Sequence, residues 1–213
     1  MAYTMTFDSL KQDIRRYIER GFTEEDDPLV YDQIPRLINM AERRIARELK
    51  VQILQNVVTT TLTQGVSVYQ KPDRWRDTIS MNFGGVDRTQ LFSRSYEYCR
   101  NYWPNEDDEG TPEFYCDYDY KHWLIVPTPN DDFEIEILYY ELPPLLDDNN
   151  QQNWLTDFAP NLLLYGALLE ATPFLKQDDR IATWQGYYDR AAQTLNGEDL
   201  LKILDRNSQR TEA

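Results

Sequence analysis

The chain has 213 residues, of which 41% are hydrophobic and 28% are charged, and its net charge is -15. This is the composition of a globular protein, which excludes a disordered chain. The sequence begins MAYTMTFDSLKQD, without a basic stretch followed by an apolar core, and its mean hydropathy is -0.70, so we expect a soluble protein without a signal peptide. Two cysteines, Cys99 and Cys116, without CxxC spacing argue against a disulfide scaffold and favour a reducing compartment.

The negative charge is concentrated in one segment of the chain. Between Pro104 and Pro160 there are fifteen acidic residues and one basic residue, Lys121, so this segment carries a net charge of -14. The first fifty residues are nearly balanced, with ten acidic and nine basic residues. A protein that holds nucleic acid by its phosphates needs an excess of basic residues. The charge therefore argues against a DNA-gripping protein, although Arg43 and Arg47 belong to a local basic patch.

Two amphipathic helices are predicted at the start of the chain. Apolar residues at helical spacing predict the first helix over residues 7–20, with Thr6 as its N-cap and Gly21 as its stop. Asp32 is the candidate N-cap of the second helix, and Pro35 suits its first turn, where backbone N–H groups lack partners. The apolar face of the second helix consists of Ile34, Leu37, Ile38, Ala41, Ile45 and Leu49.

A block of strands follows, because the spacing of the apolar residues changes near Val51. Residues 57–62 favour a strand, and Gln64-Gly65 predicts a turn into residues 66–69. Gly84-Gly85 predicts a hairpin between residues 79–83 and 86–92. The block ends at Pro143-Pro144, after a short helix (93–102), a second hairpin (113–118 with 122–126) and a half-buried strand that starts at Phe133.

Helices return near Asp157. The first is apolar around most of its surface and ends near Pro173; the second runs from residue 178 to about 196, where Gly197 interrupts it, and a polar tail extends from the body. The order of helices, strands and helices predicts an α+β fold. We expect a helical bundle formed by both chain ends (1–50 and 153–204), an inserted antiparallel β domain (51–146) and a polar C-terminal tail (205–213).

The sequence makes no positive case for an enzyme. One histidine, His122, and two isolated cysteines do not form a zinc site. Phosphate-binding glycine loops and the GxSxG nucleophile motif are absent, and Asp117 and Asp119 lack the remaining spacing of a calcium loop. A glycosidase-type carboxylate pair stays open, but the acidic pairs lie in predicted turns, where solvation explains them. We predict no catalytic residue, no cofactor and no metal.

Several motifs, in a fixed order, resemble the head-to-tail adaptor (connector) proteins of tailed bacteriophages, especially those of short-tailed phages. The resemblance covers roughly residues 7–195, and its last block is the most specific because it is the longest. The matching motifs are IPRLI (34–38), AERRIAREL (41–49), PDRW (72–75), YYELPPL (139–145), NWLT (153–156) and LYGALLEATPFL (164–175).

The resemblance implies a structural virion protein without catalysis or a cofactor. Such adaptors form a ring, commonly of twelve copies, beneath the portal at the capsid vertex; they join head to tail and let DNA pass through the lumen without specific binding. The implied partners are copies of the chain itself, the portal protein and downstream tail proteins (nozzle, fibres), with no membrane. The implied location is the head–tail junction of the virion, after assembly in the host cytoplasm.

Two sets of candidate contact residues follow from a ring. The apolar helix needs cover on both sides, and we expect its own chain to cover one side and either a neighbouring copy or the β domain to cover the other. Burial by the β domain alone is the alternative. The subunit-interface candidates are Leu164, Tyr165, Leu168, Leu169, Arg43 and Arg47, and the portal-binding candidates in the polar tail are Asp205, Arg206 and Arg210.

The acidic segment has three possible uses in such a ring. A negative lumen would repel DNA phosphates; the alternatives are a solubilising outer surface and a surface that attracts basic tail proteins.

Two other functions compete with the head-to-tail adaptor. The first is a tail-associated carbohydrate-binding or hydrolytic protein, and the second is a capsid-vertex stopper or similar ring protein. The five tryptophans discriminate the first, because a sugar-binding protein would line several of them along one exposed cleft, whereas an adaptor would bury them in cores and interfaces. They are Trp75, Trp103, Trp123, Trp154 and Trp184.

Overall fold

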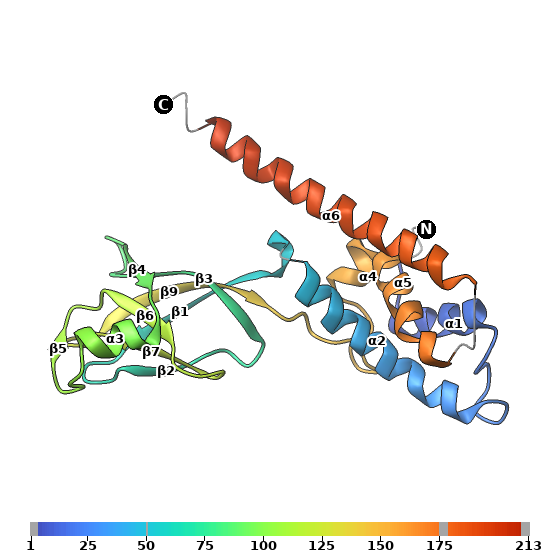
Figure 1. Ribbon diagram of the computed structural model, residues 1–213, viewed down its shortest axis with the longest axis horizontal. Coiled ribbons are helices and arrows are strands. Elements are labelled where there is room, and N and C mark those ends of the chain that lie inside the picture. Colours follow the sequence, from blue (N-terminus) through green and yellow to red (C-terminus); the bar gives the residue numbers. More distant parts are fainter. Residues whose placement is uncertain (1–3, 50, 175–178, 210–213) are drawn as a thin grey trace. The chain divides into compact units, whose positions relative to one another are not determined.

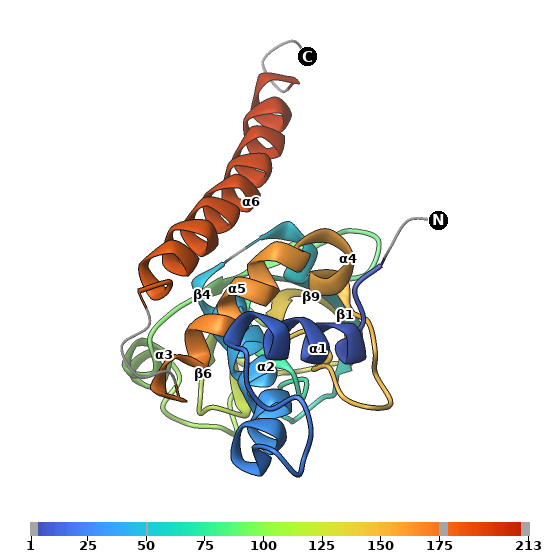
Figure 2. The same cartoon turned by 90° about the vertical axis from the view of Figure 1, so that its right-hand side faces the viewer.

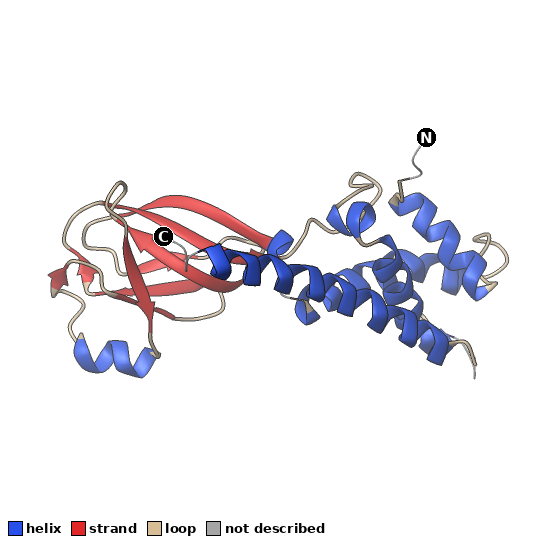
Figure 3. Ribbon diagram, turned by 90° about the horizontal axis from the view of Figure 1, so that it is seen from above, coloured by secondary structure: helices blue, strands red, loops and turns tan. Residues whose placement is uncertain are grey.

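The computed structural model describes residues 4–49, 51–174 and 179–209, with the side chains of the last helix described as far as Gly197. The chain divides into two compact units, which we call the helical unit (Met1–Leu54 with Pro143–Ala213) and the β unit (Gln55–Leu142). Figure 1 labels the elements of both units, and Figure 3 distinguishes helices from strands by colour. The predicted α+β class is confirmed, since the described residues form six α-helices and a curled seven-stranded sheet.

The helical unit contains five of the α-helices and two short 3-10 helices. Among the described residues, no helix combines the length and the apolar character that a membrane crossing requires. In chain order the elements are α1 (Phe7–Ile18), α2 (Pro28–Glu48), η1 (Gln52–Leu54), α4 (Trp154–Phe158), α5 (Pro160–Glu170), η2 (Thr172–Phe174) and α6 (Ile181–Gln209).

The beginnings of α1 and α2 follow from local capping chemistry. Thr6 caps α1 as predicted, because its hydroxyl accepts a hydrogen bond from the backbone N–H of Ser9. The predicted start of α2 at Asp32 is wrong. The helix begins at Pro28, because the Asp27 carboxylate accepts a hydrogen bond from the backbone N–H of Val30, and a proline suits the first helical position.

Helix α5 lies at the centre of the helical unit and packs on α1, α2, α4 and α6. The sequence predicted one uninterrupted helix from about Asp157, but Pro160 starts a new helix after the short α4. Gly166 permits a close approach to two neighbours: a Cβ atom there would lie 3.4 Å from Ala41 on α2 and 3.4 Å from Tyr188 on α6. Small residues in α5 therefore bring together helices of the same chain.

Helix α6 is continuous from Ile181 to Gln209, so the predicted interruption at Gly197 does not occur. Residues 205–209 of the predicted polar tail continue this helix. A single glycine costs a helix only about 1 kcal/mol relative to alanine, which flanking helix formers offset.

The β unit consists of nine strands and the helix α3 (Tyr96–Tyr102). Seven strands form one sheet in the order β1-β9-β3-β4-β6-β7-β2, and β5 pairs with β8. The strands are β1 (Gln55–Leu62), β2 (Val68–Gln70), β3 (Trp75–Phe83), β4 (Thr89–Ser93), β5 (Glu109–Gly110), β6 (Phe114–Asp117), β7 (His122–Val126), β8 (Thr128–Pro129) and β9 (Phe133–Glu141).

The strand pairing confirms two predicted hairpins and corrects two predictions. Strands β3 and β4 pair across Gly84-Gly85, and β6 pairs with β7. The seven-stranded sheet is mixed rather than antiparallel, because β4 pairs with β6 in parallel, and the separate pair of β5 and β8 is also parallel. The turn at Gly65 does not join a hairpin either, because β1 pairs with β9 and β2 pairs with β7.

The sheet curls around one apolar core. Its buried residues come from six strands and include Leu62, Met81, Trp123 and Ile137. The Tyr69 hydroxyl of β2 accepts a hydrogen bond from the Thr63 backbone N–H at 2.8 Å. This bond connects the edge strand β2 to the residue that follows the other edge strand, β1.

Candidate interaction surfaces

Three of the four predicted interface residues on α5 are buried within the helical unit. The exposed fraction of the side chain is 7% for Leu164, 0% for Leu168 and 8% for Leu169. Helices α1, α2, α4 and α6 of the same chain pack on α5, so these helices supply the cover that the sequence argument expected in part from a neighbouring copy or the β domain. These leucines retain little surface for a second subunit, whereas Tyr165 is half-buried and reaches the surface.

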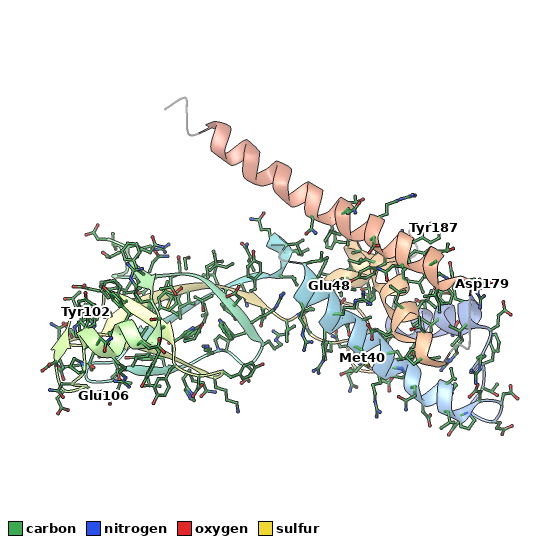
Figure 4. The ribbon with its side chains drawn as sticks, in the orientation of Figure 1. Met40, Glu48, Tyr102, Glu106, Asp179 and Tyr187 are labelled. Atoms are coloured by element: carbon green, nitrogen blue, oxygen red, sulfur yellow. The ribbon has the colours of Figure 1, made fainter. Side chains whose placement is uncertain are left out.

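The predicted pair Arg43 and Arg47 is exposed on α2. Together they line a hollow of about 510 Å³ with the half-exposed Met40; Figure 4 labels Met40 on this helix. Neighbouring Arg44 forms ion pairs with Glu48 at 2.8 Å and with Glu170 of α5 at 3.4 Å. The hollow is therefore a partly neutralised basic surface.

The predicted portal-binding residues lie at the end of the chain. Asp205 and Arg206 belong to α6, and Arg210 lies outside the described residues. Figures 1 and 2 both show the C-terminal part of α6 running beyond the other helices of its unit. The backbone of residues 205–209 is therefore presented away from the packed part of that unit.

A surface that sequence reasoning missed lies where α6 crosses α5, and we call it the tyrosine groove. The rings of Tyr165 and Tyr187 pack with their centroids 5.0 Å apart and separate two hollows of about 410 and 590 Å³; Figure 4 labels Tyr187 on α6. Phe158 and Arg190 line the first hollow, and Tyr17, Arg16 and Arg180 line the second. Only the pairing of distant helices brings these residues together.

The aromatic surface of the groove is accessible. Phe158 is 71% exposed, Tyr187 is 45% exposed and Tyr17 is 40% exposed. Burial, together with the nearby Tyr17 hydroxyl, raises the pKa of Tyr165, so its phenol is neutral at physiological pH. Tyrosine and arginine are enriched at protein interfaces because they combine large contact area with polar groups.

A second aromatic surface covers α3 and β6 of the β unit. The Tyr98 ring lies 4.5 Å from Tyr102 and 5.5 Å from Phe114, centroid to centroid. The Arg94 guanidinium lies 5.2 Å from the Phe114 centroid, and Arg100 forms an ion pair with Glu106 at 2.7 Å. Figure 4 labels Tyr102, which is 65% exposed, and Glu106 on this part of the unit.

The thiol and imidazole groups do not form a nucleophilic pair. His122 Nδ1 lies 2.9 Å from the carboxylate of Asp119 on the same turn. Burial, and to a smaller extent the neighbouring Cys99, raises the pKa of the Cys116 thiol to about 12. The thiol is therefore protonated and weakly nucleophilic at neutral pH. Across the described residues, no cluster of three or more metal-ligating side chains is found.

Exposed aromatic and arginine surfaces on both units characterise a protein whose function lies in contacts with other proteins. The chain belongs to the SU10 adaptor protein family, whose family model matches residues 5–211. This match confirms the resemblance to phage head-to-tail adaptors, a class of structural virion protein that interacts with other virion proteins. A comparison with curated proteins finds no match.

Proposed function

We propose that this protein is the head-to-tail adaptor of its phage: twelve copies form a ring beneath the portal, join the capsid vertex to the tail and let DNA pass. The observation that carries the proposal is the match to the adaptor family over residues 5–211. The match includes both units, so the argument applies to the whole described chain. The implied partners are other copies of the chain, the portal protein and the downstream tail proteins, nozzle and fibres, at the head–tail junction.

A ring requires heterologous contacts, in which one patch of a copy meets a different patch of the next copy. The surfaces that support this proposal are the exposed Arg43 and Arg47 and the half-buried Tyr165, all from the original interface candidates. The buried Leu164, Leu168 and Leu169 would support the interface indirectly, by holding α5 and therefore Tyr165 in place.

The end of the chain supports a role in portal binding. Residues 205–209 extend the helix α6 beyond the packed helices of the unit (Figure 1). A polar helix that emerges from a folded unit is a suitable element to dock on another protein. We therefore keep Asp205, Arg206 and Arg210 as the proposed portal-binding residues.

The acidic segment supports passage of DNA without binding. Between Pro104 and Pro160 the net charge is -14, and most of its carboxylates, including Asp107, Asp108 and Asp131, are exposed. A lumen lined by such residues would repel phosphates and keep the genome from adhering as it moves.

The alternative of a sugar-binding tail protein finds no support in the tryptophans. Trp123 and Trp184 are buried, and Trp75, Trp103 and Trp154 are half-buried, so none of the five belongs to an exposed row. The Trp75 and Trp123 indole N–H groups both donate to the Thr78 hydroxyl at 3.0 Å, inside the β unit.

Negative-stain microscopy of the chain mixed with the portal protein of its phage tests the proposal. We expect rings of the chain stacked on the portal, and a variant lacking residues 205–213 should fail to attach while still folding, as checked by circular dichroism. Monomers at all concentrations, with and without portal, would refute the ring, and undiminished attachment of the shortened variant would refute the role of the tail.

A further inference from the structure

We propose that copies of this chain join head to tail by inserting the loop between α1 and α2 of one copy into the tyrosine groove of the next. The inserted segment comprises residues 21–29, which are the end of the loop and the first two residues of α2, and we call it the acidic loop. This inference rests on the proposed ring and names the contact that would build it.

The acidic loop combines exposed apolar side chains with exposed carboxylates. Phe22 is 54% exposed and Leu29 is 74% exposed, which are large apolar surfaces to leave in water. Between them, Glu24, Glu25 and Asp26 are all exposed. Such a segment fits a partner surface that supplies both aromatic area and positive charge.

The shape of the acidic loop is fixed before any partner binds. Gly21 adopts a φ of 66°, and a Cβ atom there would lie 2.9 Å from Val30 Cγ1, so the turn requires glycine. Asp27 forms an ion pair with Arg20 at 2.7 Å and caps α2. A preorganised loop loses less conformational entropy on binding, which favours docking.

The tyrosine groove is complementary to this loop in both respects. Its two hollows are lined by aromatic rings on either side of Tyr165 and Tyr187, which offer sites for two apolar side chains. The lining residues include three arginines and no carboxylate: Arg16, Arg180 and Arg190, of which Arg180 also forms an ion pair with Glu19 at 3.5 Å. Because Arg16 is 69% exposed and its contact with Asp13 is 3.5 Å long, its charge is available to a second partner.

The positions of loop and groove favour a contact between copies. Figures 1 and 2 both place α6 at the top of the helical unit and the loop between α1 and α2 at its lower end. The loop begins four residues after Tyr17, which lines the second hollow, but its far end lies away from α6 of the same copy. A contact that uses two separate patches of each copy leaves one of each patch free in a dimer, so it propagates until a ring closes.

The other exposed surfaces match the acidic loop less well. The hollow on α2 has one exposed apolar side chain, Met40, and its Arg44 is already held by Glu48 and Glu170. On the surface of the β unit, Arg100 is paired with Glu106. The tyrosine groove alone among these three surfaces offers two aromatic hollows and no acidic lining residue.

Charge reversal on each side of the contact provides the test. The loop variant is E24K/E25K/D26K, and the groove variant is R16E/R190E. All five residues are exposed or half-exposed, so we expect both variants to fold, as verified by circular dichroism. Mass photometry over a concentration series, with and without the portal protein, then measures ring formation.

We expect each variant alone to lose rings, with a shift of at least about tenfold in the concentration at which they form. An equimolar mixture should restore rings, because the unchanged loop of the groove variant fits the unchanged groove of the loop variant, and the lysines of the loop variant face the glutamates of the groove variant. The matched control E97K/D107K/D108K changes the net charge as much as the loop variant but alters the β unit, and should form rings normally.

Rings that survive in either variant at the wild-type concentration would overturn this contact and leave the proposed ring intact. Equal loss of rings in the control would also overturn it, because net charge would then explain the result. If the wild-type chain forms no ring, alone or on the portal, the proposed function itself fails.

Discussion

Glu42 has an environment unlike that of an ordinary glutamate. It is fully buried on α2, yet it is a carboxylic acid. The Leu146 backbone N–H donates to both of its oxygens at 3.2 Å, and Asn153 Nδ2 donates to Oε1 at 2.6 Å. Asn153 in turn caps α4 through the Leu155 N–H. The Glu42 carboxyl group therefore connects α2 to the segment 146–153, which follows the β unit in the chain.

Burial raises the pKa of Glu42 to about 7, against the opposing effect of its hydrogen-bond donors. Because this folded-state pKa exceeds the unfolded value, the folded state binds more protons between about pH 4.5 and pH 7. Stability should therefore be highest at the acidic end of this window and fall as pH rises to 7, by up to roughly 3 kcal/mol from this group.

Denaturant unfolding from pH 5 to pH 8 measures this dependence. We expect Glu42→Gln to flatten the curve, since a neutral amide keeps the acceptor oxygen and does not titrate, whereas the exposed control Glu24→Gln should leave it unchanged. A wild-type curve parallel to that of Glu42→Gln would contradict the assignment.

At the scale of the element, α5 shows how an all-round apolar helix is accommodated within one chain. Four helices of the same unit pack on it, and Gly166 admits both α2 and α6 at close range. Leu168→Asp would therefore not be a specific test of ring formation. A charge at this fully buried position would unfold the helical unit itself.

The milder substitution Leu168→Ala tests the packing of α5. We expect it to lower the free energy of unfolding by about 2–5 kcal/mol, because it removes buried methyl groups and leaves a cavity. The control Leu29→Ala, at a 74% exposed position, should change stability by less than about 0.5 kcal/mol. Chemical denaturation of both variants below the ring-forming concentration makes the comparison; equal costs would show that α5 is not covered within the chain.

At the scale of the whole molecule, the chain leaves and re-enters the helical unit at neighbouring strands of the β unit. Gln55 of β1 pairs with Tyr140 of β9, so the two ends of the β unit lie side by side. Its core is drawn from its own strands, with Trp75 and Trp123 packed edge to face at 6.2 Å.

We therefore predict that residues 55–142 fold when expressed alone. The measurement is a cooperative thermal transition with near-ultraviolet circular dichroism from the packed tryptophans. The control Met81→Asp, which places a charge in the buried core, should abolish both signals. A wild-type fragment without a cooperative transition would show that the β unit depends on the helical unit.

Features that depend on residues close together in the chain were predicted correctly from the sequence. Helical spacing located α1 and most of α2, and Thr6 was correctly predicted as the N-cap of α1. Gly84-Gly85 predicted the hairpin of β3 and β4, and the order of the motifs indicated the adaptor family. These signals are readable because capping, turns and periodicity act over a few positions.

The contacts between segments that are distant in the sequence became known only from the folded structure. It paired β1 with β9, covered α5 with helices from both parts of the chain, placed Glu42 against Leu146 and Asn153, and assembled the tyrosine groove from α1, α4, α5 and α6. Apolar periodicity shows that a face must be buried, but not which partner buries it. The reason is that the free energy gained by removing apolar surface from water depends on the area removed and not on the identity of the partner. The choice between a helix of the same chain and a neighbouring copy therefore became visible only once the chain was folded.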